Sequence, residues 1–321
     1  MVHARHDGDV AASATMALHS QGSPTDVLGV NIAAPEEYAP SILVPIPRAK
    51  GRGLLGLAEG NLLPFAGDDV WNCYELSWLN ASGVPRRQTL ELTIPCTTPF
   101  IVESKSLKLY LNSLNFKRFA SPAAVVETIT VDVGRVLGAP LRVALRDDMV
   151  EPPLLDAWRG PRPGAGLGLS WACIDDEDVG DLPAEHLDKP DPTHLRPVAF
   201  ATGSGAVVVE RIVTHLLRAR CPVTGQPDWG SLLIEYHGAP IDRAALLRYV
   251  VSLRREIGFH ENAVERIALA IHERCQCQAL RVTGRFFRRG GIDINPVRTM
   301  GAEDIDAAIG TAPPQLRVPG Q

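Results

Sequence analysis

A cysteine and an aspartate lie close together in the stretch CPVTGQPD, residues 221–228. Two prolines and a glycine between them favour a compact loop, in which the thiol of Cys221 and the carboxyl of Asp228 can face one pocket. A thiolate is a strong nucleophile near neutral pH, and a carboxyl group in an apolar site has a raised pKa and can donate a proton. The pair suits addition to an electrophilic carbon with protonation of its heteroatom. A buried thiol beside a turn-forming aspartate is the alternative.

His260 and Glu261 stand at the start of a helix-like segment, FHENAVERI, residues 259–267. A glutamate there can favour the helix dipole. It can also accept two parallel hydrogen bonds from an amidine-like N–H pair, such as the edge of a guanine-type base. Both interpretations remain open from the residues alone.

Cationic residues occur at two further junctions. Glu103, Ser104 and Lys105 lie where an apolar strand-like run turns into a helix, with Lys108 one turn later. The first half of the chain has no nucleophile of its own, so this polar junction could serve a pocket of the second half.

Arg288 and Arg289 precede Gly290 and Gly291, just after a strand-like run. Arginines beside flexible glycines suit phosphate groups. For both junctions the alternative is a solvated surface.

Two other motifs are weak. GAGLGLS, residues 164–170, imitates a dinucleotide-binding loop, but prolines precede it and no helical period follows. His272, Cys275 and Cys277 could begin a metal site, but there is no second clustered pair of ligands. We expect unmetallated thiols there and no metal in the protein.

The composition favours a globular enzyme or binding protein with a small polar substrate. The 321 residues carry a formal charge of −5, which argues against a nucleic-acid partner or a membrane surface. No apolar run is long enough for a membrane span or a signal peptide. A cytoplasmic location is therefore expected, with reduced thiols at all six cysteines (73, 96, 173, 221, 275 and 277).

The two halves of the chain look related. With Tyr110 set against Tyr249, an offset of 139, the helix-like LYLNSL lies over RYVVSL and the strand-like PLRVAL over ALRVTG. TLELTI (89–94) and SLLIEY (231–236) are alternating strand candidates, and residues 207–220 are expected to form a helix. Each half then contains a strand, two helices and a strand, which predicts an α+β duplication.

The expected domain division follows from this duplication and from stretches rich in Pro, Gly and Ser. It comprises a flexible leader (1–40), a first module (41–150), a connection (151–205), a second module (206–300) and a tail (301–321).

Several long motifs together resemble the 7-cyano-7-deazaguanine reductases, NADPH-dependent nitrile reductases of queuosine biosynthesis, in their long two-domain form. They are ESKSLKLYLNSLN (103–115), CPVTGQPDWGS (221–231), FHENAVERI, RRGGIDINP (288–296) and LPFAGDDVWNCYELSWLN (63–80). The resemblance covers about residues 25 to 300. It implies two tunnelling-fold (T-fold) modules, each an antiparallel sheet with two helices on one face, and a homodimer.

The resemblance also implies the chemistry. Cys221 would attack the nitrile carbon to form a covalent thioimide, and Asp228 would protonate the nitrogen. Two NADPH would then reduce the thioimide to 7-aminomethyl-7-deazaguanine, without metal or flavin. The remaining residues implied are, for the deazaguanine, Val102, Glu103, Ser104, His260 and Glu261, and for NADPH, Ser104, Lys105, Arg289 and Gly290.

Two other functions remain as alternatives. One is a different tunnelling-fold enzyme, such as a GTP cyclohydrolase-like hydrolase, which would need a zinc site that this sequence does not supply. The other is a silent purine-binding or scaffold protein, because a fold alone does not define a function. The presence of both Cys221 and Asp228 argues against the second.

Overall fold

A computed structural model of the chain describes residues 35–58, 60–146, 171–198 and 207–310. The predicted leader lies almost wholly outside these residues, as do the GAGLGLS stretch and most of the predicted tail. Within the described ranges, no helix is both long enough and apolar enough to cross a bilayer.

The described chain contains helices and mainly antiparallel strands, so the predicted α+β class is confirmed. In the N-terminal half the elements are β1 (Pro45–Pro47), α1 (Arg48–Gly53), β2 (Asp68–Leu79), β3 (Pro85–Pro95), β4 (Phe100–Val102), α2 (Ser104–Asn112), α3 (Pro122–Leu137) and β5 (Arg142–Arg146). In the C-terminal half they are β6 (Ala172–Cys173), β7 (Val208–Arg220), β8 (Pro227–Gly238), α4 (Arg243–Ser252), α5 (His260–Cys275), β9 (Ala279–Phe286), β10 (Ile292–Gly301) and α6 (Ile305–Ile309).

The two halves repeat one order of elements: a hairpin, two helices and a further strand. β2–β3 corresponds to β7–β8, and both hairpins contain a register shift, between Cys73 and Leu76 in one and between Thr214 and Leu217 in the other. A shared irregularity of this kind supports the duplication, because a bulge is a feature of the backbone and not of composition. The predicted module boundaries stay a prediction.

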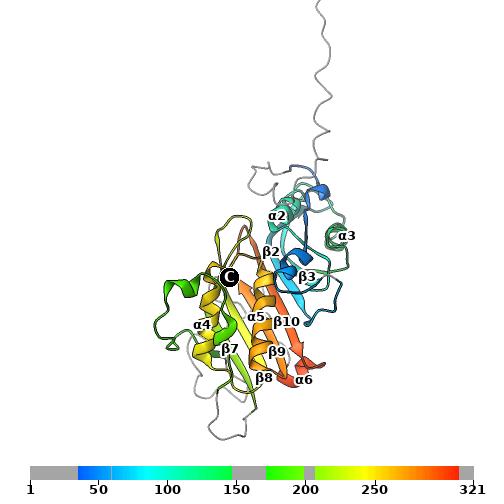
Figure 1. The fold of residues 1–321 in the computed structure, drawn as a ribbon. Coiled ribbons are helices and arrows are strands. Elements are labelled where there is room, and N and C mark those ends of the chain that lie inside the picture. The colour runs from blue at the N-terminus through cyan, green and yellow to red at the C-terminus, as the bar shows by residue number, and fades with distance from the viewer. Residues whose placement is uncertain (1–34, 59, 147–170, 199–206, 311–321) are drawn as a thin grey trace, which may run out of the picture.

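One large sheet runs through both halves, in the order β5-β3-β2-β10-β9-β8-β7-β6. β10 joins them: its first part, from Ile292, pairs with β2, and its second part, from Val297, pairs with β9. Figure 1 shows α4 and α5 lying over one face of β7–β10, with α2 and α3 beside the N-terminal strands. The pairing of β10 with both β2 and β9 therefore holds the two halves together.

Residues 207–220 do not form the expected helix, and that prediction was wrong. Val208–Arg220 is β7, paired with β8 along its length. The run is rich in β-branched residues, which favour strands. The bulge after Thr214 interrupts the alternation, so that the buried residues Thr214 and Leu217 share a face at a spacing of three, which is typical of a helix.

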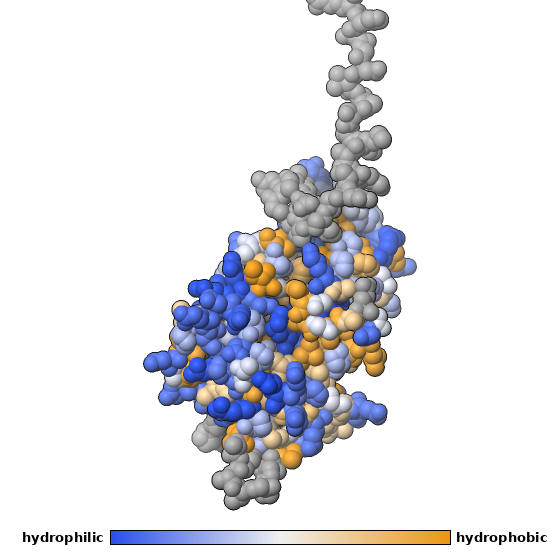
Figure 2. Space-filling model, in the orientation of Figure 1, coloured by the Kyte–Doolittle hydropathy of each residue, from blue (hydrophilic) through white to orange (hydrophobic). Residues whose placement is uncertain are grey.

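Each half has its own hydrophobic core. Leu92, Tyr110 and Ile129 belong to the first, and Tyr249 and Ile267 to the second. Figure 2 shows hydrophilic residues over α4 and hydrophobic ones over the segment between α1 and β2. These two cores fix the helices whose first turns carry the site residues.

Candidate active site

The segment from Cys221 to Gln226 is the turn of the β7–β8 hairpin. The Cys221 N–H donates to Gln226 O (2.9 Å), and the Gly225 N–H donates to Cys221 O (3.0 Å). Gly225 has φ +66°, which a glycine adopts without strain. The compact loop is therefore as predicted, but it joins two strands and Asp228 belongs to the second of them.

Asp228 is buried, with 3% of its side chain exposed, and it faces two basic side chains. It forms an ion pair with Arg289, and its Oδ2 lies 3.4 Å from His260 Nε2. Burial acts to raise the pKa of Asp228, but His260 and Arg289 outweigh it, so the pKa lies below its usual value. The expectation of a raised pKa was wrong for this arrangement, because the sequence did not reveal the two partners.

Arg289 ties the β9–β10 turn to the β7–β8 hairpin. Besides the ion pair, its Nη2 donates to Thr224 Oγ1 and Gln226 Oε1, each at 3.1 Å. The next two residues, Gly290 and Gly291, have φ +61° and +78°. The guanidinium thus lies over the Cys221–Asp228 loop, at the end of a turn that depends on glycine.

Glu261 lies in the first turn of α5 and is 2% exposed. Its Oε1 has no hydrogen-bond partner among the described residues, and neither has Nδ1 of the adjacent His260. Burial and, next, the charge of Asp69 raise the pKa of Glu261. A buried acceptor without a donor is costly, which is typical of a group that awaits a ligand.

The His260 ring has a fixed orientation. It stacks on Phe286, with the ring centroids 3.9 Å apart and the planes at 6°. Its Nε2 is thereby directed at Asp228.

Glu103 is the N-cap of α2. Its carboxylate accepts the N–H of Lys105 (3.0 Å) and that of Ser106 (2.7 Å), and it is 6% exposed. These bonds satisfy orphan amides of the first turn and place Ser104 and Lys105 at the end of β4. The sequence did not predict that Glu103 caps this helix.

All ten predicted site residues line one cavity of about 520 Å³. They are Val102, Glu103, Ser104 and Lys105 from the N-terminal half and Cys221, Asp228, His260, Glu261, Arg289 and Gly290 from the C-terminal half. The junction of the first half does contribute to the pocket of the second, as predicted.

The cavity also has walls that the sequence analysis did not identify. They include Trp71, Ile101, Phe259, Ile292 and Ile294. Only the position of Phe259 next to His260 could have signalled one of them, because residues on buried strands look alike in sequence whichever face they line.

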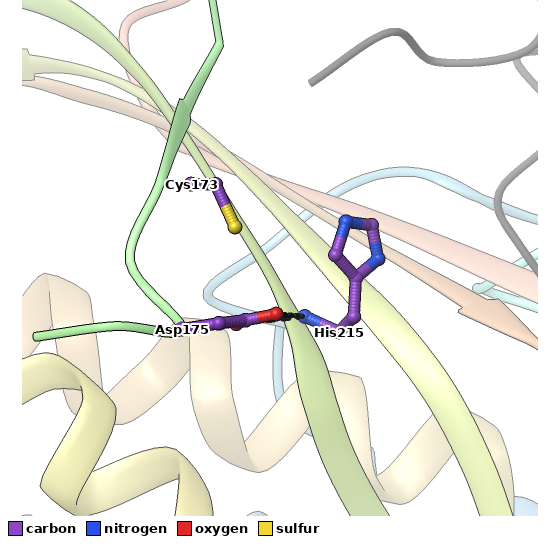
Figure 3. A group of neighbouring side chains, drawn as sticks. All are labelled: Cys173, Asp175 and His215. Atoms are coloured by element: carbon purple, nitrogen blue, oxygen red, sulfur yellow. Dashed lines mark hydrogen bonds between the residues drawn. The ribbon is translucent and has the colours of Figure 1, made fainter. Parts of the chain in front are cut away.

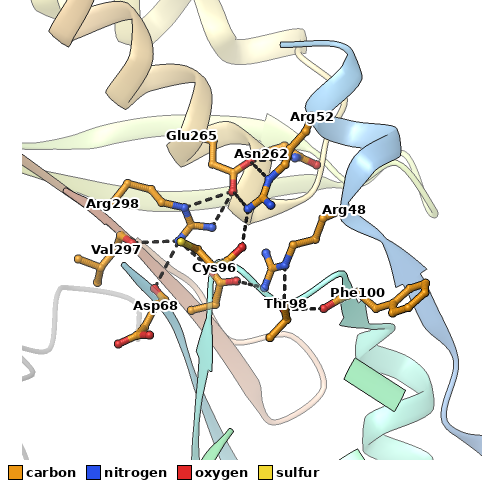
Figure 4. Close-up of polar contacts among 11 residues, drawn as sticks. Arg48, Arg52, Asp68, Cys96, Thr98, Phe100, Asn262, Glu265, Val297 and Arg298 are labelled. Carbon is orange, nitrogen blue, oxygen red and sulfur yellow. Dashed lines mark hydrogen bonds and ion pairs between the residues drawn. The ribbon is translucent and has the colours of Figure 1, made fainter. Parts of the chain in front are cut away.

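A buried ionic network lies beside this cavity and joins the halves (Figure 4). Arg298 of β10 binds Asp69 at 2.8 Å and Glu265 at 2.9 Å. Arg48 binds Asp69 at 2.6 Å, and Arg52 binds Glu265 at 2.8 Å. The network fixes α5, and with it Glu261, against α1 and β2.

Cys173, Asp175 and His215 bring possible metal ligands within 4.8 Å of one another (Figure 3). The Asp175 carboxylate accepts the Thr214 hydroxyl at 2.6 Å and the His215 backbone N–H at 3.1 Å, beside the bulge of β7. His215 Nδ1 lies 2.7 Å from Ser231 Oγ. These bonds explain the group as a support for the bulge.

The other possible metal group in the described ranges is His186, Asp191 and His194. Neither group contains His272, Cys275 or Cys277, and none of their residues lines the cavity. Burial raises the pKa of Cys275 to about 11 and that of Cys277 to about 12, so both thiols stay protonated at neutral pH.

Two family models match the chain. Residues 34–145 match the model described as nitrile reductase, 7-cyano-7-deazaguanine-reductase N-term, and residues 227–304 match that of the QueF-like protein. A solved structure, the apo form of the archaeosine synthase QueF-Like, aligns with 31% of this chain and 97% of its own at 18% identity. Its TM-score is 0.27, which is too low to indicate a common fold.

Curated relatives match over most of their length. The NADPH-dependent 7-cyano-7-deazaguanine reductase of Xanthomonas campestris is 47% identical over 85% of this chain and 91% of its own. Those of Desulfotalea psychrophila (45%; 86% and 93%) and Aromatoleum aromaticum (42%; 88% and 93%) are similar. The chain therefore belongs to the family of the NADPH-dependent 7-cyano-7-deazaguanine reductases.

Proposed function

We propose that the protein reduces the nitrile of 7-cyano-7-deazaguanine to the aminomethyl group, using NADPH and a covalent thioimide on Cys221. The observation that supports this most is the convergence of Cys221, Asp228 and Glu261 on one cavity between the two halves. Membership of the family supplies the substrate and the cofactor.

Glu261 would recognise the base. Its unpartnered Oε1 can accept an N–H from the guanine-type edge, and a carboxylate can take two such bonds in parallel. The apolar walls formed by Trp71 and Phe259 suit a flat heteroaromatic ring.

Cys221 and Asp228 would carry out the addition. The sulfur forms a bond to the nitrile carbon while one π bond of the nitrile breaks. The electron pair of that π bond moves to the nitrogen, which binds a proton. The net transfer is one proton from the Cys221 thiol to the nitrogen. Asp228 would carry this proton: its carboxylate accepts it from the thiol and then donates it to the nitrogen. His260 keeps the carboxylate in position.

The residues present fit a dinucleotide phosphate. Lys105, Lys108 and Arg289 line the same cavity and supply cationic groups. A Cβ on Gly290 would lie 3.3 Å from Lys108 Cδ, so the glycine keeps this corner open. Ser104 would add a hydroxyl. When bound, the cofactor supplies hydride, and two hydrides and two protons convert the nitrile to the amine.

Further parts of the proposal follow from the resemblance. They are the tandem tunnelling-fold modules, which the repeated order of elements supports, a homodimer, a place in queuosine biosynthesis and action in the cytoplasm.

Intact-protein mass spectrometry after mixing with 7-cyano-7-deazaguanine alone tests the proposal. The wild-type protein should gain the mass of the nitrile substrate. When NADPH is then added, its absorbance should fall by an amount that corresponds to about two NADPH oxidised per product. Cys221→Ala should lose both signals, whereas the exposed Cys173→Ala should keep both. No adduct in the wild type, or an adduct that survives Cys221→Ala, would refute it.

A further inference from the structure

Arg289 has a contact that its expected task does not explain. A residue that holds only a phosphate could point away from the reacting groups, yet this guanidinium is paired with the buried carboxylate of Asp228. It also lies against Cys221: burial lowers the pKa of Arg289, but Asp228 and Cys221 together raise it above its usual value. Arg289 thus favours the ionised form of Asp228.

This pairing opposes one step of the proposed reaction. A cation beside a carboxylate favours its ionised form, so Asp228 paired with Arg289 binds the proton of the thiol only weakly before passing it to the nitrogen. Asp228 accepts that proton more readily when the guanidinium moves away from the carboxylate.

The surroundings of Arg289 permit such a movement. Its side chain is 34% exposed, and its other contacts, to Thr224 and Gln226, are neutral hydrogen bonds that water can replace. The turn continues into Gly290 and Gly291, both in the left-handed region.

We propose that Arg289 alternates between two partners, the Asp228 carboxylate and a phosphate group of the dinucleotide. This inference rests on the proposed function. Transfer of the guanidinium to the phosphate leaves Asp228 with His260 as its remaining partner, so that the carboxylate becomes a better acceptor of the thiol proton. Cofactor binding and proton transfer by Asp228 are thereby coupled through one side chain, and Arg289 acts as a positioning residue.

The other charged groups of the cavity do not replace Arg289 in this task. Lys105 and Lys108 are on α2, and Lys108 pairs with Glu75 at 3.2 Å. Glu103 is bound to the amides of α2, and Glu261 faces the cavity from α5. Of the cavity residues, Arg289 and His260 are those with an ion pair to Asp228.

The test is the pH profile of thioimide formation, measured by mass without NADPH. For the wild type, saturating NADP⁺, which cannot donate hydride, should move the acid limb of the profile upward. Arg289→Met should move it in the same direction without any cofactor, by about 1–3 pH units, the effect of a nearby opposite charge on a carboxyl. NADP⁺ should cause no further movement in this variant.

Arg288→Met is the matched control. The Arg288 guanidinium lies 3.8 Å from the Tyr74 ring centroid and does not line the cavity. This variant should keep the wild-type profile and its response to NADP⁺.

An Arg289 that only bound cofactor would leave the cofactor-free profile of Arg289→Met unchanged, and that result would overturn the inference. So would a wild-type profile that does not respond to NADP⁺. Absence of any adduct in the wild type would instead remove the proposed function itself, so the two failures differ.

Discussion

Arginine and carboxylate side chains form two networks in this protein, and they differ in burial and in number of partners. Arg298 is fully buried and binds two carboxylates, Asp69 and Glu265, that are themselves held by further arginines. Arg289 is one-third exposed and binds one carboxylate. The buried network has no solvent to replace a lost contact, so any loss leaves a buried charge with fewer partners. The cavity network can exchange partners with solvent or ligand.

The contrast suggests which arginine–carboxylate contacts serve stability and which serve chemistry. Both lower the pKa of their aspartate, so the direction of the shift alone does not separate them. The two kinds of contact are distinguished by the exposure of the arginine and by its access to a cavity.

The largest expected effect is on catalysis, at the cavity network. Asp228→Asn keeps the size of the side chain but removes the proton carrier, so the rate of nitrile reduction should fall by about 10²–10⁴-fold. The free energy of unfolding should change little, since Arg289 can be hydrated. Steady-state NADPH oxidation and urea unfolding measure the two quantities. Asp188→Asn, at an exposed surface pair, is the control. Unfolding of the Asp228 variant at neutral pH would contradict the distinction.

The next effect is on stability, at the buried network. Arg298→Met leaves Asp69 and Glu265 buried with fewer partners and should destabilise the protein by about 3–5 kcal/mol. Arg196→Met removes a pair with Asp242 whose arginine is 68% exposed and should cost about 1 kcal/mol or less. Chemical unfolding of both variants compares them directly. Equal losses would show that burial does not set the difference.

Glu261→Gln should weaken substrate binding and leave the fold intact or more stable. Loss of a hydrogen bond to a charged group corresponds to an affinity about 10- to 150-fold lower. Burial raises the pKa of Glu261, which means that the folded state disfavours the ionised side chain at neutral pH. The neutral glutamine removes this cost from the free energy of folding. Calorimetric titration with the nitrile and thermal unfolding measure both. Glu273→Gln, exposed on the same helix, should alter neither.

The smallest effect is on the pH dependence of stability. The folded pKa of Asp69 is lowered by Arg298 and Arg48 against the effect of burial. Its stabilisation is therefore complete above the unfolded pKa of about 4 and is lost as the pH falls further. Urea unfolding between pH 7 and pH 3 should show this loss, and Asp69→Asn should flatten it more than Asp228→Asn, because Asp69 has two arginine partners.

Much of the site could be predicted from sequence because each motif is local. The loop at 221–226 depends on its own prolines and glycine, and the start of α5 at His260 depends on the pattern of the residues after it. The strand at 208–220 was mistaken for a helix because its bulge is defined by pairing with β8, which local spacing does not reveal.

The sequence by itself determined the residue types at each junction, the repeated order of elements in the two halves and the resemblance to a family. Only the tertiary structure decided that β10 pairs with both halves, that Arg289 is the partner of Asp228 and that Glu261 is buried with an unpartnered oxygen. The physical reason is that charge, burial and hydrogen bonding belong to pairs of residues. The partners here lie 61 positions apart in the case of Arg289 and Asp228 and 229 in that of Arg298 and Asp69.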